Sequence, residues 1–195
     1  MFRQRTAKVI SAFSHPVTVF PLTFPIFISR VTLTVEQIYL LFLIVLIILT
    51  PFFYLLFQIK KGEIKDWDVT ERKQRYPIYL IAVVSGTVAM VILRFFEHPH
   101  TFLVALTFYL LVLSVTAINF FWKISAHTTT ITAAVLLFYF LVQPMPYLFL
   151  LVPLVCWSRY EEKKHTWGQI FSGVGLAILV VFGVLSLVGG KALNF

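Results

Sequence analysis

The chain has 195 residues, of which 59% are hydrophobic and 12% are charged, and its mean hydropathy is +0.91. A soluble domain carries about 25% charged residues, so this composition excludes an ordinary soluble protein and predicts a polytopic membrane protein. The net charge of +8 comes from basic residues that lie between the apolar stretches. We therefore expect the bilayer and an anionic lipid headgroup, and no nucleic acid, as its partners.

Apolar stretches that can cross or enter the bilayer follow one another along the chain. A helix needs about 20 apolar residues to cross the hydrocarbon core. We predict an all-α transmembrane bundle of about six to seven membrane-embedded helices, in one domain over residues 1–195. The expected helices lie at 15–33, 35–58, 77–96, 101–121, 127–143, 145–158 and 168–190. Prolines interrupt the first stretch, and Pro144 and Pro146 predict a tight turn between the short fifth and sixth stretches.

Three polar stretches alternate with these helices, at residues 59–76, 122–127 and 158–167. Two predicted spans separate each polar stretch from the next, and two crossings return the chain to the same side. The three stretches are therefore expected on one face of the membrane. That face also receives all but Arg30, Arg94 and Lys191 of the 16 Lys and Arg residues. By the positive-inside rule it is predicted to be cytoplasmic, in the plasma (cell inner) membrane.

The stretch 158–169 has the most specific chemical pattern in the chain. Ser158 and Arg159 are followed, after five residues, by His165, and Gln169 comes four residues later. If a helix begins near His165, the Gln169 oxygen can accept the proton of one imidazole nitrogen and leave the other nitrogen free. A histidine held in this way can act as a nucleophile or a base. Arg159 offers a planar fork of donors for a phosphoryl group.

This pattern, together with Ser125, Ala126 and His127, resembles the third and second motifs of the type 2 phosphatidic acid phosphatase superfamily. Its members are integral-membrane lipid phosphatases that need no metal. The third motif usually ends in Asp, and Gln169 in its place resembles the branch that contains dolichyl-diphosphate phosphatases and their bacterial relatives. The regions that carry the resemblance are 65–77, 123–128 and 158–169.

The first motif of that superfamily is Lys, six residues, then Arg-Pro, and the stretch 65–77 fits it in two ways. Lys65 and Arg72 have the expected spacing, but a lysine follows the arginine. Alternatively, Arg75 has Pro77 one residue late and Asp68 at the position of the lysine. Both arginines stay candidates for the phosphate-binding residue.

The resemblance implies a metal-independent lipid phosphatase without a cofactor. His165 would attack phosphorus to form a phosphohistidine, and His127 would protonate the departing lipid oxygen and then activate water. Arg159 would stabilise the charge of the phosphoryl group. Further side chains would hold or orient the substrate: Arg72 or Arg75, Lys65, Lys123, Ser125, Ser158 and Gln169. The substrate would be an isoprenoid or glycerolipid phosphate or diphosphate, and no obligate protein partner is inferred.

Other functions stay open for the same residues. A catalytically silent relative would bind or transport lipid phosphates, and a phosphotransferase would pass the phosphoryl group to an acceptor other than water. Glu162 and His165 form a Glu-x-x-His step, but the second such step of a di-iron site is missing. Asp66, Asp68 and Glu71 resemble a Mg²⁺-binding loop of membrane prenyltransferases, but a second aspartate-rich loop is missing.

Some of these polar residues also have simpler explanations. Lys123 at a helix end is equally well explained as a side chain that reaches the interface and sets topology. The run 161–164 is expected to be a solvated loop. His127 and His165 could also be hydrogen-bonded interfacial histidines without a chemical role.

Overall fold

The computed structural model describes residues 2–19, 23, 26, 34–95 and 99–192, and the described residues contain helices and no strand. This confirms the predicted all-α class. In chain order the elements are α1 (Phe2–Phe13), α3 (Val35–Lys60), η1 (Arg72–Gln74), α4 (Arg75–Leu93), α5 (Pro99–Phe121), α6 (Ala126–Leu141), η2 (Pro146–Leu150), α7 (Leu151–Glu161) and α8 (Trp167–Ala192).

Four segments of these helices are long and apolar enough to span a membrane, as expected for an integral membrane protein: Leu41–Lys60, Arg72–Leu93, Thr101–Phe121 and Trp167–Leu187. Helix α6 is apolar but shorter, and η2 and α7 share the sixth predicted stretch. Most of the first predicted helix, 15–33, falls outside the described residues. The predicted count of six to seven embedded helices therefore stays a prediction.

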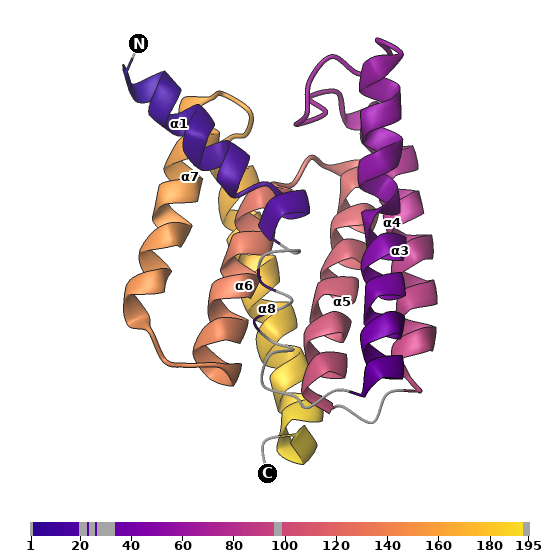
Figure 1. Ribbon diagram of the computed structural model, residues 1–195. Helices are drawn as coiled ribbons and strands as arrows, with labels where there is room; N and C mark the ends of the chain where they lie inside the picture. The colour runs from indigo at the N-terminus through magenta and orange to yellow at the C-terminus, as the bar shows by residue number, and fades with distance from the viewer. Residues whose placement is uncertain (1, 20–22, 24–25, 27–33, 96–98, 193–195) are drawn as a thin grey trace.

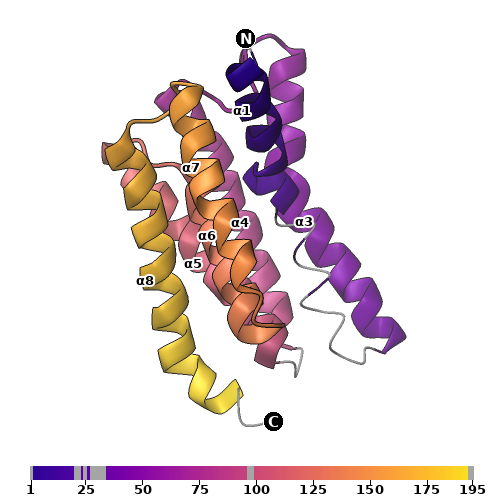
Figure 2. The same cartoon turned by 90° about the vertical axis from the view of Figure 1, so that its left-hand side faces the viewer.

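The helices form a bundle in which neighbours in sequence are also neighbours in space. Helix α3 packs on α4, α4 on α5, and α5 on both α6 and α8, while α6 also contacts α7 and α8 (Figures 1 and 2). The links α3–α4, α5–α6 and α7–α8 all lie at the upper end of the bundle in Figure 1, and the C-terminus lies at the opposite end. The polar stretches expected on one face thus share one end of the bundle.

Helix α1 was not expected from the sequence. Its basic side chains Arg3, Arg5 and Lys8 are exposed, whereas Ala7 and Ser11, one helical turn apart, are buried. The buried side faces α7, across which α1 lies at the polar end of the bundle. A short amphipathic helix has no long apolar run, so the criterion for membrane spans cannot detect it.

Two apolar clusters fix the bundle and one of its loops. The larger cluster joins α3, α4, α5, α6 and α8 through residues such as Ile44, Leu103 and Leu137. A smaller cluster buries Ile64 and Val69 of the α3–α4 loop against Leu55 of α3. This anchor holds the loop close to the bundle, where its polar residues face the starts of α6 and α8.

Candidate active site

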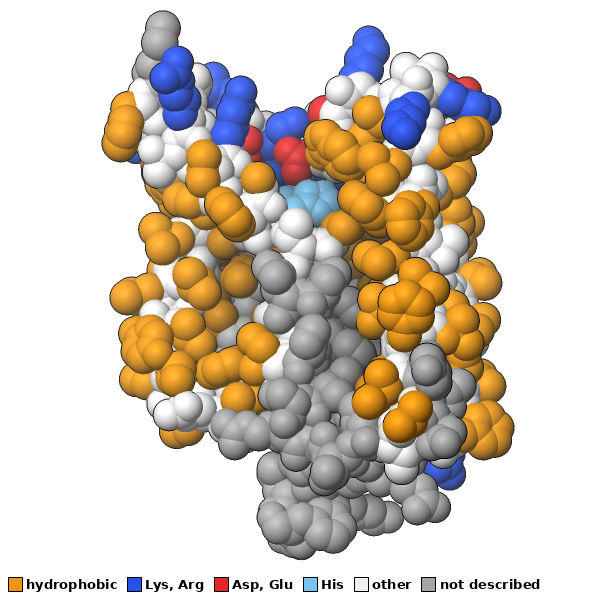
Figure 3. Space-filling view, in the orientation of Figure 1, with side chains coloured by type: hydrophobic (Ala, Val, Ile, Leu, Met, Phe, Trp, Pro, Cys, Tyr) orange, Lys and Arg blue, Asp and Glu red, His pale blue; other side chains and the backbone are white. Residues whose placement is uncertain are grey.

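The three polar stretches meet at one end of the bundle. Lys164, in the α7–α8 link, donates a hydrogen bond to Thr70 Oγ1 of the α3–α4 loop at 2.9 Å. Lys123, in the α5–α6 link, donates to the Lys164 carbonyl at 3.0 Å. In the space-filling view, charged side chains crowd this end and histidine lies in the hollow beneath them (Figure 3). The site is therefore assembled from segments that lie far apart in the sequence.

The starts of α6 and α8, which carry the two motif histidines, are joined directly. Ser125 N donates to the Gln169 carbonyl at 3.3 Å, and Thr128 Oγ1 donates to the Ile170 carbonyl at 3.2 Å. A Cβ added at Gly173 would lie 2.7 Å from the Ser125 carbonyl oxygen, so only glycine allows this approach. We call these contacts the α6–α8 junction. Ser125 itself caps α6 by accepting from Thr128 N, which is a structural role distinct from the expected phosphate contact.

His165 and Gln169 contact each other as expected, but for a different reason. His165 Nδ1 lies 3.1 Å from Gln169 Oε1, although α8 begins only at Trp167. Gln169 is positioned by a capping box, because its Oε1 accepts from Thr166 N at 3.3 Å and its N donates to Thr166 Oγ1 at 3.4 Å. With Nδ1 donating to Gln169, the His165 Nε2 lone pair is free.

The charge state of His165 suits a nucleophile. Burial, together with the positive charges of Arg159, Arg75 and Lys123, lowers the pKa of His165 to about 3, although the hydrogen bond to Gln169 acts in the opposite direction. The imidazole is therefore neutral throughout the physiological range. A neutral imidazole next to cations can attack an electrophile that those cations hold.

Arg159 is the most deeply buried charged side chain among the described residues, with 0% exposure. Its Nη1 lies 3.2 Å from Asp68 Oδ1 and 3.1 Å from Glu162 Oε2, and it also donates to Ser11 Oγ of α1. A buried guanidinium requires such partners, since an unpaired charge there is strongly destabilising. The sequence predicted the arginine but not its carboxylate partners.

Asp68 lies at the centre of the basic residues. Its Oδ1 is 3.5 Å from His127 Nε2 as well as 3.2 Å from Arg159, and its Oδ2 is 3.6 Å from Lys164 Nζ. Burial raises the pKa of Asp68, but the charges of Arg159 and Lys164 outweigh burial, and the net shift is downward. Asp68 is therefore a carboxylate at neutral pH.

Of the two first-motif arginines, the structure brings Arg75 into the cluster. Arg75 is 5% exposed, and its guanidinium donates to the carbonyls of Val69 at 2.7 Å and Asp68 at 3.0 Å. Arg72 points elsewhere and donates to the Phe121 carbonyl at the end of α5 at 2.6 Å. Lys65 is exposed, and no contact within the described residues joins it to the cluster.

Lys123 and Ser158 both lie within the polar end of the bundle. Lys123 is half-buried, and burial together with the charges of Arg75 and Lys164 lowers its pKa to about 8. Ser158 is fully buried, and its Oγ has no hydrogen-bond partner among the described residues. Lys123 thus joins the polar cluster through Lys164, and Ser158 is a buried hydroxyl next to Arg159 in the chain.

The run 161–164 is not the solvated loop expected from the sequence. Glu162 pairs with Arg159, and Lys164 pairs with both Asp66 and Asp68 at 3.6 Å. Only Lys163 in this run is exposed. The expectation was wrong because four consecutive charged residues look alike in sequence, whereas the end of α7 and the turn after it direct three of the four side chains toward partners.

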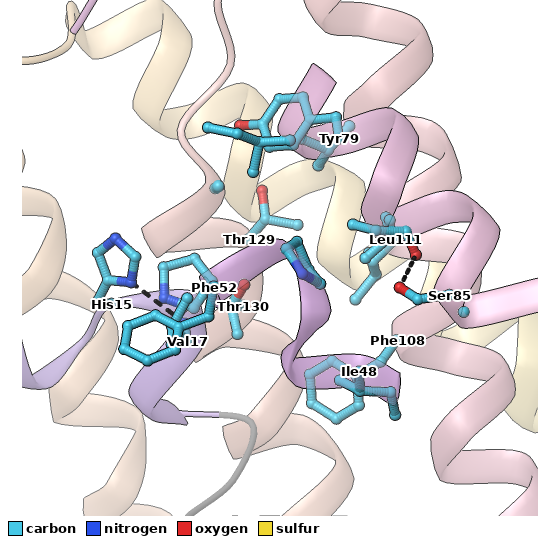
Figure 4. A pocket seen from close by; sticks show the side chains of 18 of the residues that line it. His15, Val17, Ile48, Phe52, Tyr79, Ser85, Phe108, Leu111, Thr129 and Thr130 are labelled. Atoms are coloured by element: carbon cyan, nitrogen blue, oxygen red, sulfur yellow. Dashed lines mark hydrogen bonds between the residues drawn. The ribbon is translucent and has the colours of Figure 1, made fainter. Parts of the chain in front are cut away.

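His15 is a site residue that sequence reasoning missed. Its ring packs edge-on against His127 with centroids 5.0 Å apart, and its Nδ1 accepts from Val17 N at 3.2 Å (Figure 4). We predicted this position to be the start of the span 15–33. The sequence around it shows only a histidine before Pro16, and this pattern does not by itself indicate a functional site.

His15, Asp68 and His127 also raise the question of a metal, because their ligand atoms lie within 4.8 Å of one another. The surrounding charges oppose it. Arg159 and Lys164 lie within 3.6 Å of the Asp68 carboxylate, and the Nδ1 of His15 already accepts a backbone hydrogen bond. A cation would be repelled by these residues, whereas an anion would be attracted.

A cavity of about 260 Å³ leads from this cluster into the apolar part of the bundle. Its polar end is formed by His15, Asp68, Arg75, His127 and His165. The rest is lined mainly by apolar side chains of α3, α4 and α5, among them Ile48, Phe52, Tyr79, Phe108 and Leu111 (Figure 4). The lining on α4 runs from residue 75 to residue 93, which is about 27 Å at about 1.5 Å per residue. This length exceeds the depth of one leaflet, which is about 15 Å.

Comparison with protein-family models, with curated proteins and with solved structures finds no match for this chain. The site is defined by two histidines, buried cations and an apolar cavity that ends at them.

Proposed function

We propose that this chain is an integral-membrane, metal-independent lipid phosphatase of the type 2 phosphatidic acid phosphatase superfamily. It removes phosphate from an isoprenoid or glycerolipid phosphate or diphosphate. The observation that carries the proposal is the shared position of His127, His165 and Arg75 at the polar end of one apolar cavity, with Arg159 beside them. Such a site receives an anionic headgroup and its apolar tail together.

The reaction follows from the two histidines. Burial and the charge of Arg159 lower the pKa of His127 well below its usual value, so His127 must take up a proton together with the anionic substrate. His165 Nε2 attacks phosphorus, the bond between phosphorus and the lipid oxygen breaks, and His127 gives this proton to that oxygen. Water then attacks the phosphohistidine while His127 takes a proton from it. The bond between phosphorus and nitrogen breaks, which returns His165 to its neutral form and releases inorganic phosphate.

Buried polar atoms without partners support a bound anion. Arg159 Nε, Ser158 Oγ and His127 Nε2 are buried and have no hydrogen-bond partner among the described residues. Buried polar groups are nearly always hydrogen-bonded, so these atoms have hydrogen-bonding capacity that an anion or water could use. A phosphoryl group supplies acceptor oxygens for the guanidinium and the hydroxyl, and its negative charge is balanced by Arg75, Arg159 and Lys123.

The membrane location follows from the same features. The apolar sides of the bundle contact lipid tails, and the cavity keeps the substrate tail within the bilayer. We propose that the polar end faces the cytoplasm of the plasma (cell inner) membrane. The exposed Arg3, Arg5 and Lys8 of α1 at that end support this orientation.

Phosphate release in detergent tests the activity. Purified protein with phosphatidic acid or a polyprenyl diphosphate in EDTA should release phosphate, and His165→Ala should abolish release while the protein stays folded. Activity that requires Mg²⁺, or that survives His165→Ala, contradicts the mechanism. Binding without release indicates the silent relative, and transfer to a second lipid indicates the phosphotransferase.

Cysteine labelling tests the orientation separately. Cys156 is buried, so Cys156→Ser gives a background in which Lys65→Cys, at an exposed loop position, is the single thiol. An impermeant reagent should not label this thiol in intact cells and should label it after lysis. Labelling from outside contradicts a cytoplasmic site.

A further inference from the structure

The carboxylate of Asp68 contacts the groups that a substrate phosphate would need. Its Oδ1 lies 3.2 Å from Arg159 Nη1 and 3.5 Å from His127 Nε2, and its Oδ2 lies 3.6 Å from Lys164 Nζ. A carboxylate and a phosphoryl group both present anionic oxygens that accept from such donors. The Asp68 carboxylate therefore lies where a phosphate would bind these groups, and a phosphate bound there must displace its side chain.

The backbone around Asp68 is held independently of these ion pairs. Arg75 bonds the carbonyls of Asp68 and Val69, and the Val69 side chain is buried against Leu55 and Ile64. The loop can therefore stay in place while the Asp68 side chain turns away. Displacement of the carboxylate requires a change of rotamer and not the unfolding of the loop.

The membrane surface presents a selectivity problem to a cationic site. Arg75, Arg159, Lys123 and Lys164 attract any lipid phosphate, and the phosphodiester headgroups of ordinary phospholipids vastly outnumber phosphate monoesters. A phosphodiester carries one negative charge, whereas a monoester approaches two at neutral pH because its second pKa is about 6. The two classes thus differ by about one charge at the same position.

We propose that Asp68 is a specificity-determining residue that excludes phosphodiesters and admits phosphate monoesters. Its single charge is tethered in the site, so its effective concentration is high. A phosphodiester brings no more charge than Asp68 and cannot displace it, whereas a monoester brings about one charge more. This inference rests on the proposed function, because it assigns the substrate class of the same site.

A matched control is available in the same loop. Asp66 pairs with Lys164 at 3.6 Å, but no contact among the described residues joins it to Arg159 or His127. Asp66→Asn and Asp68→Asn therefore remove the same charge from neighbouring positions of one loop. Only Asp68→Asn removes it from the phosphate position.

Binding to two matched ligands tests the proposal. Dodecyl phosphate and dodecyl methyl phosphate have the same tail but differ in charge, and their Kd values can be measured by calorimetry in nonionic micelles with EDTA. A His165→Ala background prevents turnover. With Asp68 present, we expect the monoester to bind at least about tenfold more tightly than the diester. Asp68→Asn should strengthen diester binding about tenfold, whereas Asp66→Asn should change it less than about twofold.

Unchanged or weaker diester binding in Asp68→Asn overturns the proposal. Asp68→Ser, which also removes the charge, must give the same result, and thermal unfolding of each variant shows that it is folded. Phosphate release from dodecyl phosphate is measured in parallel with His165 present. If phosphate is released but Asp68→Asn leaves both Kd values unchanged, the inference about Asp68 is wrong and the proposed phosphatase activity stands. If the Kd values change as expected but no phosphate is released, the proposed phosphatase activity is wrong and the selectivity of the anion site stands.

Discussion

The α6–α8 junction and the α3–α4 loop bring residues to the same site by different forces. The junction is held by hydrogen bonds to backbone carbonyls and by the close approach at Gly173. The loop contributes Asp68, whose side chain is held by ion pairs with Arg159 and Lys164. Packed backbone fixes positions to fractions of an ångström, whereas an ion pair can exchange one anion for another. The histidines are thus fixed in place, and the charges around them can accept a ligand.

The strongest test of this comparison is His165→Ala, which removes the proposed nucleophile and leaves every ion pair of the loop in place. We expect phosphate release to fall by at least about a thousandfold, because the phosphohistidine cannot form. Binding of dodecyl phosphate should persist. A loss of binding as large as the loss of turnover contradicts the separation between the two regions.

Arg75→Ala tests the loop side of the comparison. Arg75 holds two loop carbonyls and lines the cavity, so its loss should reduce kcat/KM about a hundredfold. The matched variant Arg72→Ala removes a hydrogen bond to the end of α5 and should cost less than about fivefold. Equal losses in steady-state phosphate release would show that both arginines serve the first motif.

Gly173→Ala tests whether the junction must be tight. The added Cβ would lie 2.5 Å from Thr128 Oγ1 and 2.7 Å from the Ser125 carbonyl, so the start of α6 must move away from α8. A shift of about 1 Å can cost up to about a hundredfold in rate, and we expect a fall of at least tenfold in kcat. Gly175→Ala is the control, because a Cβ there meets nothing within 4 Å. Similar kcat values for the two variants would show that the junction tolerates movement.

The smallest expected effect is the pH dependence from Lys123. Its pKa is lowered to about 8, so the ammonium is charged below that pH and loses its proton as the pH rises through it. The KM for a phosphate monoester should therefore increase by about threefold to tenfold between pH 7 and pH 9.5. Lys123→Arg keeps the charge and should remove the increase. A rise of the same size in Lys123→Arg assigns the pH dependence to another group.

The all-α class and the pairing of His165 with Gln169 could be predicted from the sequence, because each depends on composition or on residues close together in the chain. The predicted contact between His165 and Gln169 is present, but the local structure that produces it differs from the one predicted. It assumed a helix from His165, whereas the capping box with Thr166 places the amide. The choice between Arg72 and Arg75 depended on which way η1 and the start of α4 turn, which spacing alone does not determine.

The parts that could not be predicted depend on contacts between distant segments. His15 contacts His127 only because the segment directly after α1 lies against the start of α6. Asp68 was noted as an acid in place of a lysine and as part of a possible Mg²⁺ loop. Its ion pair with Arg159 joins residues that α4, α5 and α6 separate in the chain. Charged residues in a loop carry no periodicity, so their direction is set by tertiary structure alone.

The contact between Ser11 and Arg159 joins residues that are 148 positions apart, and it has a consequence for how the protein is made. Helix α1 leaves the ribosome long before α7, so the guanidinium gains this partner only when nearly the whole chain has entered the membrane. A chain that stops before α7 lacks both Arg159 and His165. The proposed hydrolase site can therefore form only after α7 and the link to α8 have been synthesised.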